Sequence, residues 1–104
     1  MLTEQIKDQI KENLLSNFSL EKIILFGSQA RGTADKKSDV DLLVIASSFN
    51  DRFKIMREIR RSLLAFDYAF DIIAVTPEEY ERDKNIPGTI ARYASKEGIA
   101  IYES

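Results

Sequence analysis

Residues 26–44 read FGSQARGTADKKSDVDLLV and place a Gly-Ser pair ten residues before an Asp-x-Asp pattern. The apolar run 22–26 ends at the Gly-Ser pair, and the apolar run 40–46 begins between the two aspartates. Both runs have the length and composition of buried strands, and the second is apolar enough to be covered on both faces. The polar segment 27–38 contains two glycines and is expected to be a loop with room for one helical turn.

The two aspartates at the start of the second run are spaced for metal chemistry. Side chains two apart on a strand share a face, so Asp39 and Asp41 are expected to lie about 7 Å apart at Cα, with Val40 directed into the core. Carboxylates at this separation can hold one hard cation or bridge a pair, and Mg²⁺ prefers oxygen ligands and nucleotide phosphates. The alternative is a loop end with solvated acids and a cap.

A third carboxylate, Asp71, interrupts the apolar run 69–75. An unpaired carboxylate inside an apolar strand is costly, so Asp71 is expected to join Asp39 and Asp41 if its strand neighbours theirs. Three adjacent carboxylates repel one another strongly, and bound Mg²⁺ would relieve that repulsion. The alternative for Asp71 is an edge-strand acid paired with Lys or Arg.

The Gly-Ser pair has the chemistry of a phosphate-binding turn. Gly27 lets the backbone approach an anion closely, and Ser28 can donate its hydroxyl and N–H at the start of a helical turn. Arg31 lies one turn further on and is expected to reach the same phosphates, unless it is only a surface residue. Lys36 and Lys37 could also contact a triphosphate, although a polar loop tip explains them equally well. The pair can meet the aspartates only if the two strands are antiparallel neighbours.

The rest of the chain alternates helical and strand patterns, which predicts one α/β or α+β domain spanning 1–104. Helices are expected at 4–18, at 51–66, in a short segment after Thr76 and at about 89–97, with further strands at 69–75 and 99–102. Thr76, Pro77 and Glu79 form a capping-box pattern, and Gly98 is placed to follow the last helix.

The expected helix 51–66 has two contrasting faces. Its apolar stripe is predicted to face the core and comprises Phe53, Met56, Ile59, Leu63 and Phe66. Its polar face carries Arg52, Lys54, Arg57, Arg60 and Arg61. A solvated face is the expected reading, and a surface for an acidic partner or RNA is the alternative.

Composition excludes several kinds of chemistry. The chain has no Cys and no His, so disulfides, thiol nucleophiles, the usual zinc sites and imidazole catalysis are all excluded. Lys and Arg number 15 against 17 Asp and Glu, a net charge of −2 that argues against nucleic-acid or membrane binding driven by bulk charge. The polar N-terminal segment and the short apolar runs lead us to expect a cytoplasmic protein.

The segment FGSQARGTADKKSDVDLLV resembles the signature of the nucleotidyltransferases related to DNA polymerase beta, and the short chain resembles their minimal nucleotidyltransferase (MNT) group. The ending KEGIAIYE is similar to that group's closing helix, glycine and strand. The resemblance implies the polymerase beta-like fold, a small mixed sheet flanked by helices. It also implies that Asp39, Asp41 and Asp71 bind Mg²⁺ and that Gly27 and Ser28 hold the phosphates of ATP. Asp67, four residues before Asp71, is an alternative third carboxylate.

In such proteins AMP passes from ATP to a hydroxyl, and many members pair with a HEPN ribonuclease toxin and act as its antitoxin, some by adding AMP to a tyrosine. The resemblance therefore implies a HEPN-type partner for this chain. A domain of this size has little room for an acceptor site of its own, so we expect another chain to complete the cleft. The alternatives are a catalytically silent module that masks its partner, and a homo-oligomer that transfers nucleotide to a small molecule.

Overall fold

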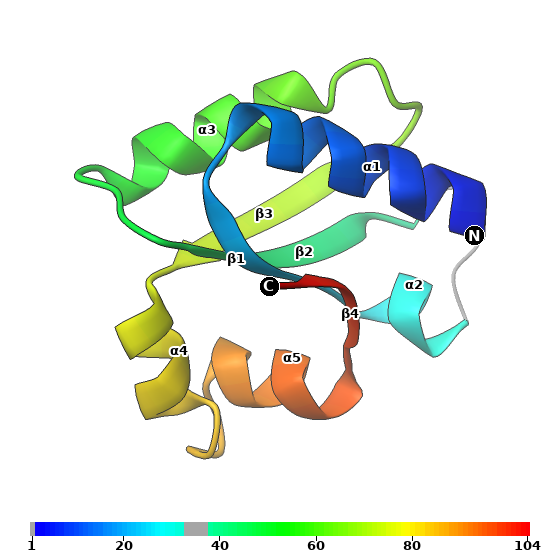
Figure 1. The fold of residues 1–104 in the computed structure, drawn as a ribbon. Coiled ribbons are helices and arrows are strands. Elements are labelled where there is room, and N and C mark those ends of the chain that lie inside the picture. Colours follow the sequence, from blue (N-terminus) through cyan, green and yellow to red (C-terminus); the bar gives the residue numbers. More distant parts are fainter. Residues whose placement is uncertain (1, 33–37) are drawn as a thin grey trace.

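The computed structural model describes residues 2–32 and 38–104, which form a mixed four-stranded sheet flanked by helices (Figure 1). The elements are α1 (Glu4–Asn17), β1 (Leu20–Phe26), α2 (Ser28–Arg31), β2 (Val40–Ala46), α3 (Arg52–Ser62), β3 (Phe70–Val75), α4 (Pro77–Asp83), α5 (Ile90–Glu97) and β4 (Ile99–Glu103). The strand order is β3-β2-β1-β4, with β1 antiparallel to both of its neighbours and β2 parallel to β3. The predicted α+β class with a small mixed sheet is confirmed.

Helices cover both faces of the sheet. Figure 1 shows α1 and α3 on one face, α4 and α5 on the other, and α2 at the end of β1. The side chains of β2 alternate between the two cores: Val40, Leu42 and Val44 pack toward α1 and α3, while Leu43 and Ile45 pack toward α4 and α5. The odd-numbered residues of β2 therefore face α4 and α5, which places Asp41 on that side of the sheet.

Helix α3 differs from its prediction in its length and in the position of Phe53, whereas Met56, Ile59, Leu63 and Phe66 pack in the core as predicted. It ends at Ser62 rather than continuing to residue 66, and Phe53 is 67% exposed instead of buried. Phe53 is exposed because its neighbour Arg52 faces the sheet in the first turn of the helix. Its guanidinium donates to the carbonyl oxygen of Ala74 at 2.5 Å and to Glu79 Oε2 at 2.6 Å. Arg52 therefore belongs to an ion pair, not to the solvated face on which it was predicted.

Helix α4 begins at its predicted capping residues, and α5 begins one residue later than the predicted position 89. Thr76 and Glu79 form the reciprocal capping box with Pro77 in the first turn, and Thr89 caps α5. Gly98 follows α5 as expected, but it has φ −89° and so has no conformational need for glycine. Its requirement is steric, because a Cβ there would overlap the carbonyl oxygen of Ala94 and lie 2.5 Å from Ile24 Cγ2.

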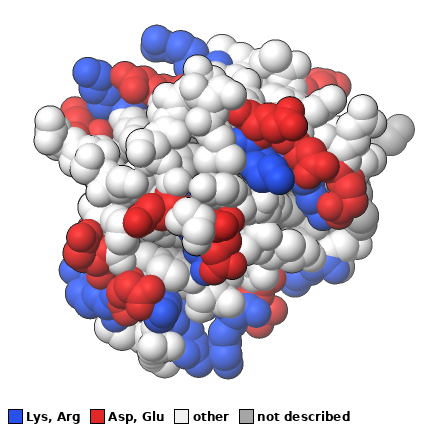
Figure 2. Space-filling view, in the orientation of Figure 1, with Lys and Arg blue, Asp and Glu red and all other residues white. Residues whose placement is uncertain are grey.

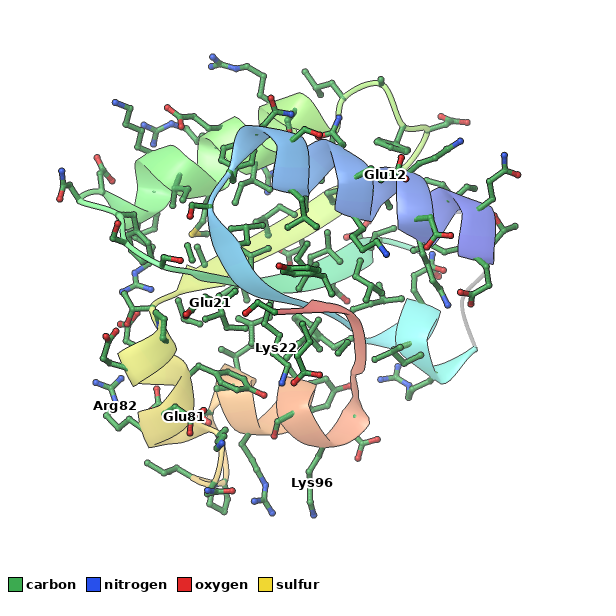
Figure 3. All side chains as sticks on the ribbon, in the orientation of Figure 1. Glu12, Glu21, Lys22, Glu81, Arg82 and Lys96 are labelled. Atoms are coloured by element: carbon green, nitrogen blue, oxygen red, sulfur yellow. The ribbon has the colours of Figure 1, made fainter. Side chains whose placement is uncertain are left out.

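Lys22, near the start of β1, links this strand to α4 and to β4. Lys22 extends from β1 toward α4, where its Nζ lies 5.3 Å from the ring centre of Tyr80 and 2.9 Å from Glu103 Oε1 (Figure 3). Lys96 and Arg82 extend away from the sheet in the same view.

Across residues 2–32 and 38–104, no helix has both the length and the apolar character needed to cross a membrane.

Candidate functional site

Asp41 forms the centre of the candidate site because it is paired across both neighbouring strands. It stands opposite Phe26 in the antiparallel ladder with β1 and opposite Asp71 in the parallel ladder with β3. The predicted antiparallel pairing of the first two strands is thus confirmed, and so is the adjacency of the second and third. Gly27, which follows Phe26, is brought directly to Asp41 by this register.

Gly27 makes close contact with the Asp41 carboxylate. A Cβ added to Gly27 would overlap Asp41 Oδ2 and lie 3.2 Å from its Cγ. Gly27 also has φ +77°, a conformation that side-chain-bearing residues rarely adopt. The backbone turn and the approach of the carboxylate therefore both require glycine, whereas the sequence predicted it only for contact with an anion.

Asp41 carries an unfavourable charge in this setting. Burial raises the pKa of its carboxyl above the ordinary value of 3.8, and the negative charges of Asp71 and Asp39 raise the pKa further. The positive charge of Arg31 acts in the opposite direction on the same pKa. Three of the predicted site residues, Asp71, Asp39 and Arg31, thus act electrostatically on Asp41.

The three predicted carboxylates do not by themselves make a finished metal site. Within 2–32 and 38–104, no three acidic side chains gather closely enough to form a complete set of ligands. Asp39 and Asp71 are exposed, while Asp41 is half-buried. Proteins usually hold Mg²⁺ with one or two carboxylates together with water and substrate phosphates. The observed grouping therefore has the chemistry of a site that a polyphosphate would complete.

The predicted phosphate-binding turn is a single helical turn, α2. The amides of Ala30 and Arg31 both donate to the carbonyl oxygen of Gly27 at 3.1 Å, and the turn ends at Gly32 with φ +75°. Ser28 occupies the first position, where backbone N–H groups have no earlier carbonyl within the helix to bind. The turn starts directly after Gly27, the residue that lies against the Asp41 carboxylate. Lys36 and Lys37, also considered for phosphate contact, lie outside the described residues.

Gln29 has a role that the sequence analysis missed. It is 3% exposed, its Oε1 accepts from the amide of Leu2 at 3.1 Å, and its Nε2 donates to the carbonyl oxygen of Ser38 at 3.3 Å. It therefore fastens α2 both to the start of the chain and to the residue before Asp39. A polar residue in a polar loop gives no sequence signal for such burial.

Tyr93 is a second residue that the sequence analysis did not assign to the site. Its hydroxyl accepts a hydrogen bond of 2.6 Å from Arg31 Nη1, and its ring packs edge-to-face on Phe26. Tyr93 is 39% exposed and lies at the rim of the core. Its link to Arg31 spans 62 positions and depends entirely on the packing of α5 against β1.

The molecular surface in Figure 2 shows acidic and basic side chains interspersed over the visible face rather than gathered into one extended patch of either sign. A continuous basic track for a nucleic-acid backbone is therefore not seen on that face.

The family of the chain follows from its sequence matches. Residues 7–100 match the family described as "Nucleotidyltransferase domain". The chain belongs to this nucleotidyltransferase family, and the resemblance seen in residues 26–44 is confirmed.

Two relatives come from Methanocaldococcus jannaschii. "Putative protein adenylyltransferase MJ1305" is 44% identical over 73 residues, which cover 66% of this chain and 44% of that protein. "Putative protein adenylyltransferase MJ0604" is 32% identical over 83 residues, covering 80% of this chain and 79% of that protein. The match thus spans less than half the length of the first relative and most of the second.

Solved structures share the fold. A mutant MntA-HpeT toxin–antitoxin complex contains a chain with a TM-score of 0.72 at 23% identity, covering 100% of this chain and 75% of that one. A toxin–antitoxin with AMP-PNP gives 0.64 at 21% identity, covering 94% and 73%. A tri-AMPylated Shewanella oneidensis HEPN toxin in complex with MNT antitoxin gives 0.61 at 19% identity, covering 98% and 74%. At these identities the likeness establishes the fold alone.

Proposed function

We propose that this chain is a Mg²⁺-dependent nucleotidyltransferase that moves AMP from ATP to a hydroxyl group of a partner protein. The observation that carries the proposal is the strand register that aligns Phe26, Asp41 and Asp71 across β1, β2 and β3. It brings the Gly27-Ser28 turn, suited to phosphates, against carboxylates suited to a hard cation. Membership of the nucleotidyltransferase family supports this reading of the two features.

The residues fit a divalent cation that arrives with the nucleotide. Asp41 carries a charge that burial and its acidic neighbours disfavour, so a cation beside it relieves a real electrostatic cost. Asp39, Asp41 and Asp71 are the ligands that we assign to it. Bound Mg²⁺ would neutralise the charge that develops on the phosphates during transfer.

The protein's own groups then have distinct roles. Gly27 and Ser28 receive the phosphates of the bound nucleotide, and Arg31 binds the same phosphates. The acceptor oxygen forms a bond to the α-phosphorus as the bond from that phosphorus to the bridging oxygen of pyrophosphate breaks. Asp71 accepts the hydroxyl proton. Its exposure on an edge strand leaves room for an acceptor presented by another macromolecule.

We assign the acceptor to a tyrosine of a HEPN-type toxin, with this chain as the antitoxin. The support comes from the two relatives named as protein adenylyltransferases and from the shared fold of an MNT antitoxin bound to a tri-AMPylated HEPN toxin. The donor is ATP, in keeping with the AMP-PNP complex of similar fold.

Intact-mass analysis of a HEPN protein from a neighbouring reading frame tests the proposal after incubation with this chain, ATP and Mg²⁺. The expected result is the addition of one or more AMP groups to a tyrosine, absent when EDTA is added. Asp41→Asn is the inactive comparison, and Asp67→Asn is its matched control, because Asp67 precedes β3 and lies outside the aligned register.

A masking module is the second candidate. Such a module silences its partner by binding alone. The Asp41→Asn variant would then silence the toxin to the same extent as the wild-type chain, and neither would leave an AMP adduct on the toxin. A homo-oligomer acting on a small molecule would instead release AMP-linked product without any protein partner.

A further inference from the structure

The hydroxyl of Tyr93 on α5 accepts a hydrogen bond from Nη1 of Arg31 on α2, with an N–O distance of 2.6 Å. This bond joins the turn that begins the candidate phosphate site to the helix layer on the same face as Asp41. A bond this short to a charged donor belongs to the stronger class of protein hydrogen bonds.

The ring of Tyr93 is held by Phe26, the residue that precedes the Gly27-Ser28 turn. Its ring meets Phe26 edge-to-face, with ring centres 5.9 Å apart and planes inclined by 80°. Phe26 is 6% exposed, ends β1 and stands opposite Asp41. The ring is therefore anchored on the same strand end that carries the Gly-Ser turn, and its hydroxyl is presented to Arg31 from a rigid support.

Arg31 needs such a support. Its side chain is exposed and long, so without a partner it would sample many rotamers and lose that freedom on binding a phosphate. A guanidinium that is already oriented loses less entropy when it forms its bonds to a ligand. The hydrogen bond to Tyr93 uses Nη1, and within residues 2–32 and 38–104 no other hydrogen bond of the guanidinium is seen.

We infer that Tyr93 is a positioning residue that orients Arg31 toward the phosphates of the bound nucleotide. Tyr93 touches Arg31 and not the reacting atoms, so it acts on nucleotide affinity and leaves the chemical step unchanged. This inference rests on the proposed function, because it assumes that a nucleotide binds at the Gly27-Ser28 turn.

The test is calorimetric binding of a non-hydrolysable ATP analogue with Mg²⁺, which requires neither a partner protein nor turnover. Tyr93→Phe keeps the ring and its contact with Phe26 but removes the hydroxyl. We expect about a threefold to tenfold loss of affinity, the size of the net contribution of one ordinary protein hydrogen bond, with an unchanged melting temperature. Tyr68→Phe is the matched control, because Tyr68 packs on Phe70 in the core on the opposite face.

A double-mutant cycle with Arg31→Ala identifies the route. If Tyr93 acts through Arg31, Tyr93→Phe causes no further loss of affinity in the Arg31→Ala background. In turnover assays the KM for ATP rises in Tyr93→Phe while kcat at saturating ATP is retained.

Several outcomes overturn the inference. The positioning role is excluded if Tyr93→Phe leaves the affinity for the analogue unchanged. It is also excluded if Tyr93→Phe causes the same loss of affinity in the wild-type and Arg31→Ala backgrounds. Either result leaves the proposed function intact. An AMP adduct on Tyr93 itself would make it an acceptor instead. A wild-type chain that binds no analogue overturns the proposed function, and this inference with it.

Discussion

The carboxylate of Asp41 lies so close to Gly27 that a single methyl group on the glycine would overlap its Oδ2. This approach follows from the antiparallel register of β1 and β2, which sets Phe26 opposite Asp41. Gly27, the residue after Phe26, therefore lies next to the carboxylate. The Gly27-Ser28 turn and the Asp41 carboxylate are therefore in direct contact, and a change to either disturbs the other.

Gly27→Ala is expected to destabilise the fold and to abolish binding of ATP with Mg²⁺. The positive φ alone costs a residue with a side chain about 1–2 kcal/mol, and displacement of the Asp41 carboxylate adds to it. Urea unfolding measures the loss. Gly88→Ala is the matched control, because Gly88 has φ +90° and open space around it, so it carries the backbone strain without the overlap. Equal losses in the two variants would contradict the close approach.

Asp41→Asn is expected to abolish transfer while making the metal-free protein more stable. Burial, Asp71 and Asp39 all raise the Asp41 pKa, so the folded state binds this proton more tightly than the unfolded state. The stability of the wild-type chain in EDTA should therefore fall as the pH rises from the ordinary value of 3.8 through the raised pKa, and Asn should remove this contribution. Melting curves in EDTA at several pH values test it, and a lower melting temperature for the variant at neutral pH would contradict the electrostatic argument.

Binding of ATP is expected to depend on divalent metal. Three carboxylates at the site repel a triphosphate, and Arg31 alone offsets only one of their charges. Calorimetry with EDTA should show binding at least about tenfold weaker than with Mg²⁺, a difference of about 1.4 kcal/mol. One like-charge contact at about 4 Å exceeds that value at the effective dielectric constant of about 20 that is typical near a protein surface. Equal affinity under both conditions would remove the metal from the proposal.

The ion pair between Arg52 and Glu79 is expected to contribute to stability in a pH-dependent way. The hydrogen bond from Arg52, aided by the backbone of Thr76, lowers the Glu79 pKa below its ordinary value of 4.5. The contribution is thus fully present above pH 4.5 and is lost as the pH falls through the lowered pKa. Glu79→Gln should melt below wild type at pH 7, and the difference should close in acid. Glu78→Gln, on an exposed neighbour in the same turn, should melt like wild type at both pH values.

Helix α3 is expected to tolerate substitution at one predicted core position and not at another. Phe53→Ala should change the free energy of unfolding by less than about 0.5 kcal/mol because the side chain is 67% exposed. Ile59→Ala should cost about 2–5 kcal/mol because Ile59 is fully buried. Chemical denaturation of the two variants compares them directly, and similar losses would contradict the observed exposure of Phe53 and burial of Ile59.

Much of the architecture could be predicted from local sequence. Apolar runs bounded by glycine or aspartate located the strands, with β2 predicted at its observed limits, and the Thr76 capping box located the start of α4. These features are readable because their causes are local: side-chain alternation, capping hydrogen bonds and the conformational needs of glycine and proline act within a few residues. The Gly-Ser and Asp-x-Asp spacing also predicted which residues would meet, provided that the strands paired as neighbours.

Contacts between distant segments were decided by the tertiary structure. The pairing of Asp71 with Asp41 depends on β3 lying beside β2, and the bond between Arg31 and Tyr93 depends on how α5 packs below β1. Arg52 replaced Phe53 at the sheet because Glu79 and the Ala74 carbonyl, more than twenty residues away, offered it partners. These contacts have no local sequence signal. A guanidinium or a phenol is well solvated by water until the fold brings a partner within hydrogen-bonding distance.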